Sequence, residues 1–227
     1  MKYIKTYEQS KGITFQEWLK ENPQDLNITG LDCHECNLID LDGLEQFVNL
    51  KKLHCRKNQL TQLPDLPKRL ETLICSENQL DKLPDLPMML KFLSCFGNNL
   101  RQLPILPNTL EYINCCNNNL KQLPDLPSML VQLRCDDNEL TSLPQLPNTL
   151  VFLYCEFNQL IKLPDIPNTL EELRCRNNQL SFLPDLPDTL KLLYCFGNRL
   201  PYNDLEGYWG WHKKTYPWIW DAKKYNI

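Results

Sequence analysis

Residues 150–169, LVFLYCEFNQLIKLPDIPNT, decide the fold because their pattern recurs along most of the chain. Cysteine returns every 20 residues from Cys55 to Cys195, and asparagine, leucine and paired prolines follow the same period. The unit L-x-x-L-x-C-x-x-N-x-L-x-x-L-P-x-L-P-x-x occurs in seven copies without an insertion. Such a fixed period is typical of a solenoid, in which each repeat packs only against its neighbours.

Each repeat is expected to contribute one short strand. Leu153 and Cys155 are two residues apart, so they share one face of a strand, whereas Tyr154 and Glu156 share the other. Asn158 should then turn the chain out of the strand, with its amide bonded to the backbone of neighbouring turns, because a buried polar group needs such partners. The strands of successive repeats would form a parallel sheet on the concave face.

The rest of each repeat is too short for a helical crossover. Its two prolines fix φ and remove two amide donors, which favours an extended or polyproline II path on the convex face. Two less regular turns precede the array, ITGLDCHECNL at residues 28–38 and IDLDGLEQFVNLKKLHC at residues 39–55. The sequence therefore predicts a mainly β solenoid with nine strands, the last of them around residues 193–195.

Segments outside the period flank the repeats. We expect three parts, an N-terminal helical cap at residues 1–27, the repeats at 28–200 and an aromatic-rich C-terminal cap at 201–227. Thr14 and Glu17 have the spacing of a capping box, followed by an apolar face of Phe15, Trp18 and Leu19. The C-terminal part holds four of the five tryptophans and would cover the open end of the solenoid. A partner-binding aromatic patch is the alternative for this part.

Composition and charge limit the classes of function that we expect for the protein. The formal net charge is −4, which argues against a general nucleic-acid or membrane binder. We expect no signal peptide and no membrane span, since the chain has no apolar run long enough for either. Side chains stacked in register have poor disulfide geometry, so the column of cysteines predicts a reduced protein. The expected location is intracellular and cytoplasmic, including the cytoplasm of a host cell.

The segments LPDLPNTL and L-x-x-L-x-C-x-x-N-x-L resemble the short, 20-residue bacterial-type leucine-rich repeats. Proteins of this kind include the YopM-like and IpaH-like effectors, and similar arrays occur in giant DNA viruses of amoebae. The resemblance covers roughly residues 14–200 and implies a leucine-rich repeat solenoid that binds a partner. In the IpaH-like branch it also implies a separate ubiquitin-ligase domain, for which residues 201–227 are too few. The cysteine in the last core position departs from the bacterial pattern.

Two thiol motifs suggest chemistry. Cys135 precedes Asp137 by two residues, a Cys-x-Asp spacing that some ubiquitin-transferring enzymes share. The repeat register instead places Cys135 in the buried core, where a thiol packs as a small apolar group. Cys116 falls in an outward column and is expected to be accessible.

The stretch CHEC, Cys33 to Cys36, could be half of a zinc site or a redox motif. Both cysteines fill structural positions of the first repeat, and no second C-x-x-C exists. His34, Glu35 and His54 could approach one another at the edge of the sheet. With no further ligand evident, we expect no metal site, no cofactor and no catalytic residues.

The columns of the strand face that do not form the core hold aromatic residues interleaved with charges. These residue types are enriched at interface hot spots, so the sequence predicts a partner-binding surface there. The candidate residues are Phe92, Phe96, Tyr112, Arg134, Asp136, Phe152, Tyr154, Glu156, Phe157, Arg174, Arg176, Tyr194 and Phe196. Stacking and ion pairing that only stabilise the sheet are the alternative.

The leading hypothesis is a non-enzymatic module that binds a protein, as a host-targeted effector or a viral adaptor. Nucleic-acid binding through the ladder of Arg134, Tyr154, Arg174 and Tyr194 is a second possibility. The neighbouring carboxylates make it less favourable. A substrate-recognition fragment of a ubiquitin ligase is a third.

Overall fold

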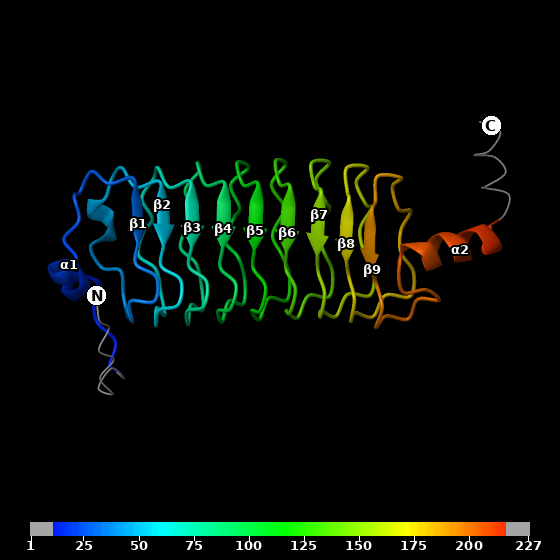
Figure 1. Ribbon diagram of the computed structural model, residues 1–227, viewed down its shortest axis with the longest axis horizontal. Helices are drawn as coiled ribbons and strands as arrows, with labels where there is room; N and C mark the ends of the chain where they lie inside the picture. The colour runs from blue at the N-terminus through cyan, green and yellow to red at the C-terminus, as the bar shows by residue number, and fades with distance from the viewer. Residues whose placement is uncertain (1–10, 217–227) are drawn as a thin grey trace, which may run out of the picture.

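The computed structural model, which describes residues 11–216, is a solenoid of short turns with one strand in each (Figure 1). Nine strands form one parallel sheet in sequence order, as the repeat count predicted. Each strand is three residues long. They are β1 (Gly30–Asp32), β2 (Lys52–His54), β3 (Thr72–Ile74), β4 (Phe92–Ser94), β5 (Tyr112–Asn114), β6 (Gln132–Arg134), β7 (Phe152–Tyr154), β8 (Glu172–Arg174) and β9 (Leu192–Tyr194).

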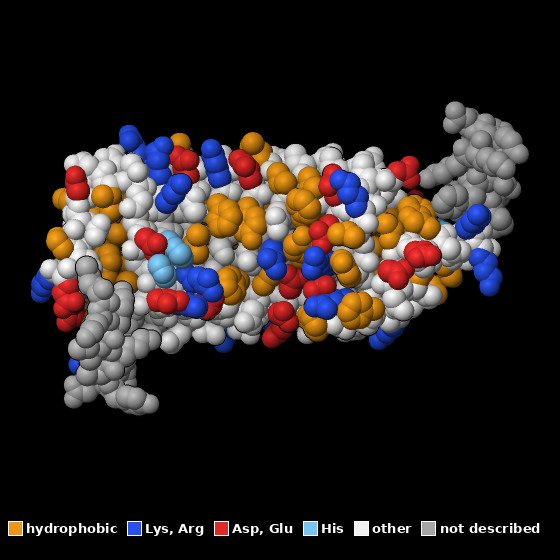
Figure 2. Space-filling view, in the orientation of Figure 1, with side chains coloured by type: hydrophobic (Ala, Val, Ile, Leu, Met, Phe, Trp, Pro, Cys, Tyr) orange, Lys and Arg blue, Asp and Glu red, His pale blue; other side chains and the backbone are white. Residues whose placement is uncertain are grey.

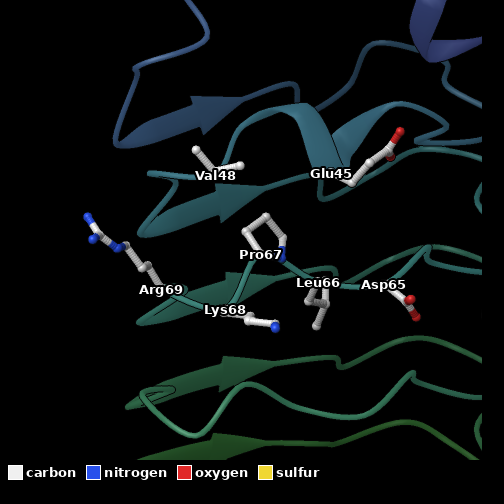
Figure 3. A pocket seen from close by; sticks show the side chains of 7 residues that line it. All are labelled: Glu45, Val48, Asp65, Leu66, Pro67, Lys68 and Arg69. Atoms are coloured by element: carbon white, nitrogen blue, oxygen red, sulfur yellow. The ribbon is translucent and has the colours of Figure 1, made fainter.

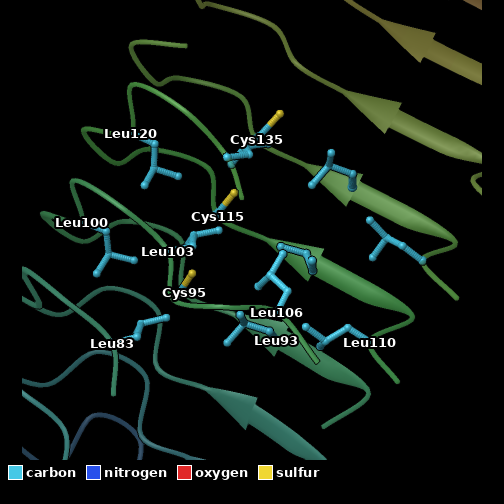
Figure 4. Close-up of a cluster of buried hydrophobic side chains, with 14 of the residues drawn as sticks. Leu83, Leu93, Cys95, Leu100, Leu103, Leu106, Leu110, Cys115, Leu120 and Cys135 are labelled. Atoms are coloured by element: carbon cyan, nitrogen blue, oxygen red, sulfur yellow. The ribbon is translucent and has the colours of Figure 1, made fainter. Parts of the chain in front are cut away.

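Columns of leucine and cysteine form the core. The middle residue of each strand pairs in register with the next, as Leu53 does with Leu73, and points inward. The cysteine after each strand is fully buried, so Cys95 and Cys115 stack one turn apart (Figure 4). Free cysteine is small and apolar enough to pack here without a partner. All eleven cysteines are unpaired in the structure.

An asparagine ladder ties consecutive turns together. The side-chain nitrogen of Asn118 donates to the carbonyl oxygens of Cys95 and Cys115, at 3.1 Å each. Its side-chain oxygen accepts from the backbone nitrogen of Leu100 at 3.0 Å. Buried polar groups are thereby satisfied on both sides of the turn, as the sequence predicted.

The return segments that carry the paired prolines contain neither helix nor strand. Each ends in a tight turn, such as the one closed by the backbone nitrogen of Leu70 and the carbonyl of Pro67 at 3.0 Å. Two leucines of this segment face the interior. Leu63 is buried, and Leu66 packs partly against the core. The segments therefore form the second wall of the solenoid.

The N-terminal end begins with α1 (Phe15–Glu21), where the predicted capping box between Thr14 and Glu17 is present. Phe15 and Trp18 are buried, and Leu19 packs partly against the core. The second turn contains a short 3₁₀ helix, η1 (Leu44–Gln46), which the sequence reasoning did not predict.

The C-terminal end carries α2 (Leu205–Thr215), whose N-cap Asp204 accepts from the backbone nitrogen of Gly207. Before it, Asn203 accepts a hydrogen bond from the backbone nitrogen of Cys195, so this segment covers the free edge of β9. Tyr208 is buried against the last turn. Trp218 and Trp220, part of the predicted aromatic cap, lie outside the described residues.

Candidate binding face

The sheet presents an outward surface that we call the strand face, formed by the side chains of β4–β9 that alternate with the core residues and by the residue after each core cysteine (Figure 2). All thirteen predicted residues belong to this face or its rim. Phe92 and Tyr112, on adjacent strands, stack in parallel with ring centroids 4.2 Å apart. Phe152 lies in the same column two strands further on and is half-buried.

Two ladders of cation–π contacts cross the C-terminal half of the strand face. Arg174 lies between two rings, 4.9 Å from the centroid of Tyr154 and 5.0 Å from that of Tyr194. Arg134 covers the other side of Tyr154 at 5.3 Å. These four residues are the alternating column identified in the sequence, and each contact is worth about 0.5–1 kcal/mol at an exposed site.

The second ladder is centred on Arg176. Its guanidinium lies 5.0 Å from the ring centroid of Phe157 and 5.5 Å from that of Phe196. Phe96 takes part in a separate contact with Arg56, at 5.4 Å, that the sequence reasoning did not foresee. The face thus consists of aromatic rings held in place by arginines.

Carboxylates beneath the rings fix the arginines. Arg174 donates to Glu172 at 2.6 Å, and the hydroxyl of Tyr154 donates to the same carboxylate at 3.1 Å. Arg176 Nε lies 3.0 Å from Glu156, and Arg134 Nε lies 4.0 Å from Asp136. Each arginine of the two ladders therefore has an acidic partner within ion-pair distance.

Asp136 and Glu156 differ from the expectation that they would be open to a partner, since each is only 8% exposed. Asp136 also accepts a hydrogen bond from the backbone nitrogen of Glu156 at 3.0 Å. Burial raises the pKa of Glu156, although the charge of Arg176 opposes the shift. These two carboxylates support the ladders, and the surface available to a partner is mainly aromatic.

Three aromatic side chains are the most exposed of the candidates. Phe157 is 42% exposed, and Tyr194 and Phe196 are each 40% exposed. Phe157 also has a φ of 51°, in the left-handed region that costs a non-glycine residue about 1–2 kcal/mol. The same position is left-handed in every regular repeat, with Gly97 and Asn117, which tolerate this conformation, but also with Lys57 and Glu77.

The thiol motifs give no nucleophile. Cys135 is fully buried, and burial together with the neighbouring thiols raises its pKa well above the ordinary value. Cys116 is partly exposed, but burial and the charge of Asp136 raise its pKa too. The expected accessible thiol is therefore a poor nucleophile, and Cys36 is a second partly exposed thiol.

At the other end of the sheet, the structure brings His34 and His54 together as the sequence suggested. Glu35 does not join them, because its carboxylate pairs with Lys57 at 2.7 Å. Asp32 takes its place, with Oδ1 2.7 Å from Nδ1 of His34. The sequence reasoning missed Asp32, although the 22-residue spacing from Cys33 to Cys55 places Asp32 beside His54.

A pocket of about 420 Å³ opens on the return segments, away from the strand face (Figure 3). Its lining combines apolar side chains with charges of both signs and contains no histidine or cysteine: Glu45, Val48, Asp65, Leu66, Pro67, Lys68 and Arg69. Within residues 11–216, no helix is long and apolar enough to cross a membrane.

Comparison with known proteins identifies the family to which this solenoid belongs. A family model described as leucine-rich repeats in two copies matches residues 26–68. YopM from Yersinia enterocolitica WA-314 aligns at 36% identity with a TM-score of 0.64, over 77% of this chain and 43% of that one. The protein is a leucine-rich repeat protein of the short bacterial type. No curated protein matches the chain.

Two further solved leucine-rich repeat structures are informative. A Shigella effector domain aligns at 28% identity with a TM-score of 0.60, over 89% of this chain and 80% of that one. InlJ from Listeria monocytogenes aligns at 31% identity with a TM-score of 0.73, over 80% of this chain and 42% of that one. The InlJ domain is described as including a cysteine ladder, so a cysteine column is compatible with a bacterial leucine-rich repeat. This chain spans less than half of the Yersinia enterocolitica YopM chain and of the InlJ chain.

Proposed function

We propose that this leucine-rich repeat protein is a non-enzymatic interaction module that binds a protein partner on the strand face, between Phe92 and Phe196. The observation that carries the proposal is the exposed aromatic group of Phe157, Tyr194 and Phe196, in which Arg174 and Arg176 hold the rings. Rigid aromatic side chains lose little conformational entropy on binding, which makes them effective anchors at protein interfaces.

The identity of the residue at position 157 supports a role beyond packing. A large aromatic residue occupies a left-handed position where a glycine or asparagine would fit with less strain. Its contact with Arg176 recovers only part of that cost. The turn itself recurs in every repeat, so the support for binding comes from the exposed aromatic ring at this position, where Lys57 and Glu77 stand in other repeats.

The charged side chains of the strand face favour a protein partner over a nucleic-acid partner. Arg134, Arg174 and Arg176 each have a carboxylate nearby, so little positive charge remains for phosphate groups. The solved relatives described as effectors, from Yersinia pestis and Shigella, make an effector-type module the preferred setting. The column of free thiols favours a reducing, intracellular location.

The test is capture of a partner from a lysate of candidate host cells, quantified by mass spectrometry. The variant Tyr154→Ala with Phe157→Ala should lose the partner, and the purified pair should bind at least about tenfold more weakly, since each hot-spot side chain contributes 1 kcal/mol or more. The matched control, Ile105→Ala with Ile161→Ala, truncates two exposed apolar residues of the return segments and should bind normally.

Circular dichroism and urea unfolding of both double variants report whether the fold is kept. Equal retention of the partner by the two variants would show that the strand face is not the binding surface. A captured species that is lost on nuclease treatment, with retention that falls steeply as salt rises, would favour the nucleic-acid alternative instead.

A further inference from the structure

Two histidines and an aspartate meet at the N-terminal end of the sheet. The rings of His34 and His54 stack with centroids 4.9 Å apart and an interplanar angle of 14°. Both Nδ1 atoms face the same carboxylate oxygen, Asp32 Oδ1, at 2.7 Å for His34 and 3.3 Å for His54. Figure 2 shows histidine side chains, in pale blue, on the exposed surface near the N-terminal end of the sheet.

The backbone fixes this arrangement. Asp32 of β1 and His54 of β2 are register partners, so their side chains emerge next to each other on the same face. His34 follows two residues after Asp32, and its backbone nitrogen bonds to Asp32 Oδ1 at 3.2 Å. The parallel hydrogen bonds continue on both sides, from Cys33 to His54 and from Glu35 to Arg56, at 2.9 Å each. The backbone that carries the three side chains is thus held in place by hydrogen bonds between the first two turns.

Neighbouring charges are already paired with one another. Glu35 pairs with Lys57, and Arg56 donates to Glu77 at 2.8 Å. The carboxylate of Asp32 therefore faces the two imidazoles, and all three groups are open to solvent to some degree. An ion could reach them without a change in the fold.

We propose that Asp32, His34 and His54 form a binding site for one divalent transition-metal ion of the Zn²⁺ class. Imidazole nitrogen and carboxylate oxygen bind Zn²⁺ at about 2.0–2.2 Å, so neighbouring ligand atoms of a tetrahedral site lie about 3.3 Å apart. The His54 nitrogen lies at that separation from Asp32 Oδ1, at 3.3 Å, the His34 nitrogen is nearer at 2.7 Å, and all candidate ligand atoms lie within 4.8 Å of one another. Three protein ligands leave a fourth position for water.

The proposed site departs from the expectation from sequence that the chain binds no metal. That expectation rested on the lack of a ligand beyond the histidines, and Asp32 supplies one. A hydrogen-bonded triad without metal affinity is the competing interpretation, because a carboxylate can accept from both imidazoles. The two interpretations differ in whether the chain takes up an ion.

Isothermal titration of the tag-free full chain with Zn²⁺, in a buffer that does not chelate metals, provides the test. We expect one ion per chain, with affinity reduced at least about tenfold by Asp32→Asn, His34→Ala or His54→Ala and abolished by the two histidine substitutions together. The chain has three histidines, so His212→Asn in α2 is a matched control that should bind as the wild type does. Cys36→Ser should also bind normally.

Long-range ¹H–¹⁵N spectra of the histidine rings provide a second readout. Added Zn²⁺ should shift the ring nitrogens of His34 and His54 and leave those of His212 in place. Absence of Zn²⁺ binding by the wild type, retention of binding by the His34→Ala/His54→Ala variant, or loss of binding in Cys36→Ser would each overturn the proposal. Circular dichroism of each variant confirms that the surface substitutions preserve the fold.

Discussion

The thiol of Cys116 donates a hydrogen bond to the buried carboxylate of Asp136, with Sγ and Oδ2 3.1 Å apart. A donor thiol keeps its proton, and both burial and the negative charge of Asp136 raise the pKa of Cys116. The thiolate is the nucleophilic form of cysteine, so this contact makes a partly exposed thiol unreactive.

The reactivity of Cys116 should increase in Asp136→Asn, because the substitution removes the charge that disfavours the thiolate. Each unit by which the pKa falls gives about tenfold more thiolate near neutral pH. Iodoacetamide labelling followed by mass spectrometry measures the rate, and Asp137→Asn is the control that removes a neighbouring charge. An unchanged rate in Asp136→Asn would contradict this account, as would rapid labelling of Cys135 in the native protein.

The fold could be read from the sequence because one repeated column determines each structural role. The positions of the cysteines and asparagines predicted the strands, the buried core and the asparagine ladder. The burial of Asp136 and Glu156 could not be predicted in this way, since it depends on how Arg134 and Arg176 fold over the sheet. The proximity of Asp32 to His54 could be predicted from the 22-residue spacing between Cys33 and Cys55. The prediction requires aligning the irregular second turn with the first.

Asn118→Ala should destabilise the protein strongly. It leaves the backbone nitrogen of Leu100 and the carbonyls of Cys95 and Cys115 without their side-chain partner, and an unsatisfied buried group costs about 1–3 kcal/mol. Urea unfolding measures the change. The adjacent exposed residue offers a control, since Asn119→Ala should change the free energy of unfolding by less than about 0.5 kcal/mol. Equal effects of the two substitutions would argue against the ladder as a source of stability.

We propose that residues 1–27 and 201–227 close the two ends of the repeats at 28–200. Tyr208, on the buried side of α2, is 1% exposed, so Tyr208→Ala should cost about 3 kcal/mol, as for other large buried aromatic residues. Gly210 lies within the same helix, and a Cβ there would meet no atom within 4 Å. Gly210→Ala should therefore stabilise the protein by up to about 1 kcal/mol.

Thermal and urea unfolding measure both substitutions in α2. A deletion of residues 202–227 separates the two interpretations of this segment. Loss of solubility supports a cap, whereas a stable protein that loses only its partner supports a binding patch. A Tyr208→Ala variant as stable as the wild type would rule out a capping role for α2.

Stability should depend on pH through Glu156. Burial raises its folded-state pKa above the ordinary 4.5, so the folded protein binds this proton more tightly than the unfolded chain does. Stability is then lost as pH rises from the unfolded pKa through the folded one. The free energy of unfolding of the wild type, relative to Glu156→Gln, should decrease as pH rises above the ordinary pKa of 4.5. Urea titrations across this range test the sign, and an increasing difference would show that Arg176 outweighs burial.

Phe157→Asn distinguishes a structural role of this ring from a binding role. Asn117 and Asn177 occupy the same left-handed position in other repeats, so asparagine should relieve about 1 kcal/mol of backbone strain. The lost contact with Arg176 should cost about 0.5–1 kcal/mol, which leaves the free energy of unfolding nearly unchanged. Affinity for a captured partner should nevertheless fall about tenfold or more, measured by titration of the purified pair. A variant that is clearly less stable but binds normally would show that Phe157 serves the solenoid and not its partner.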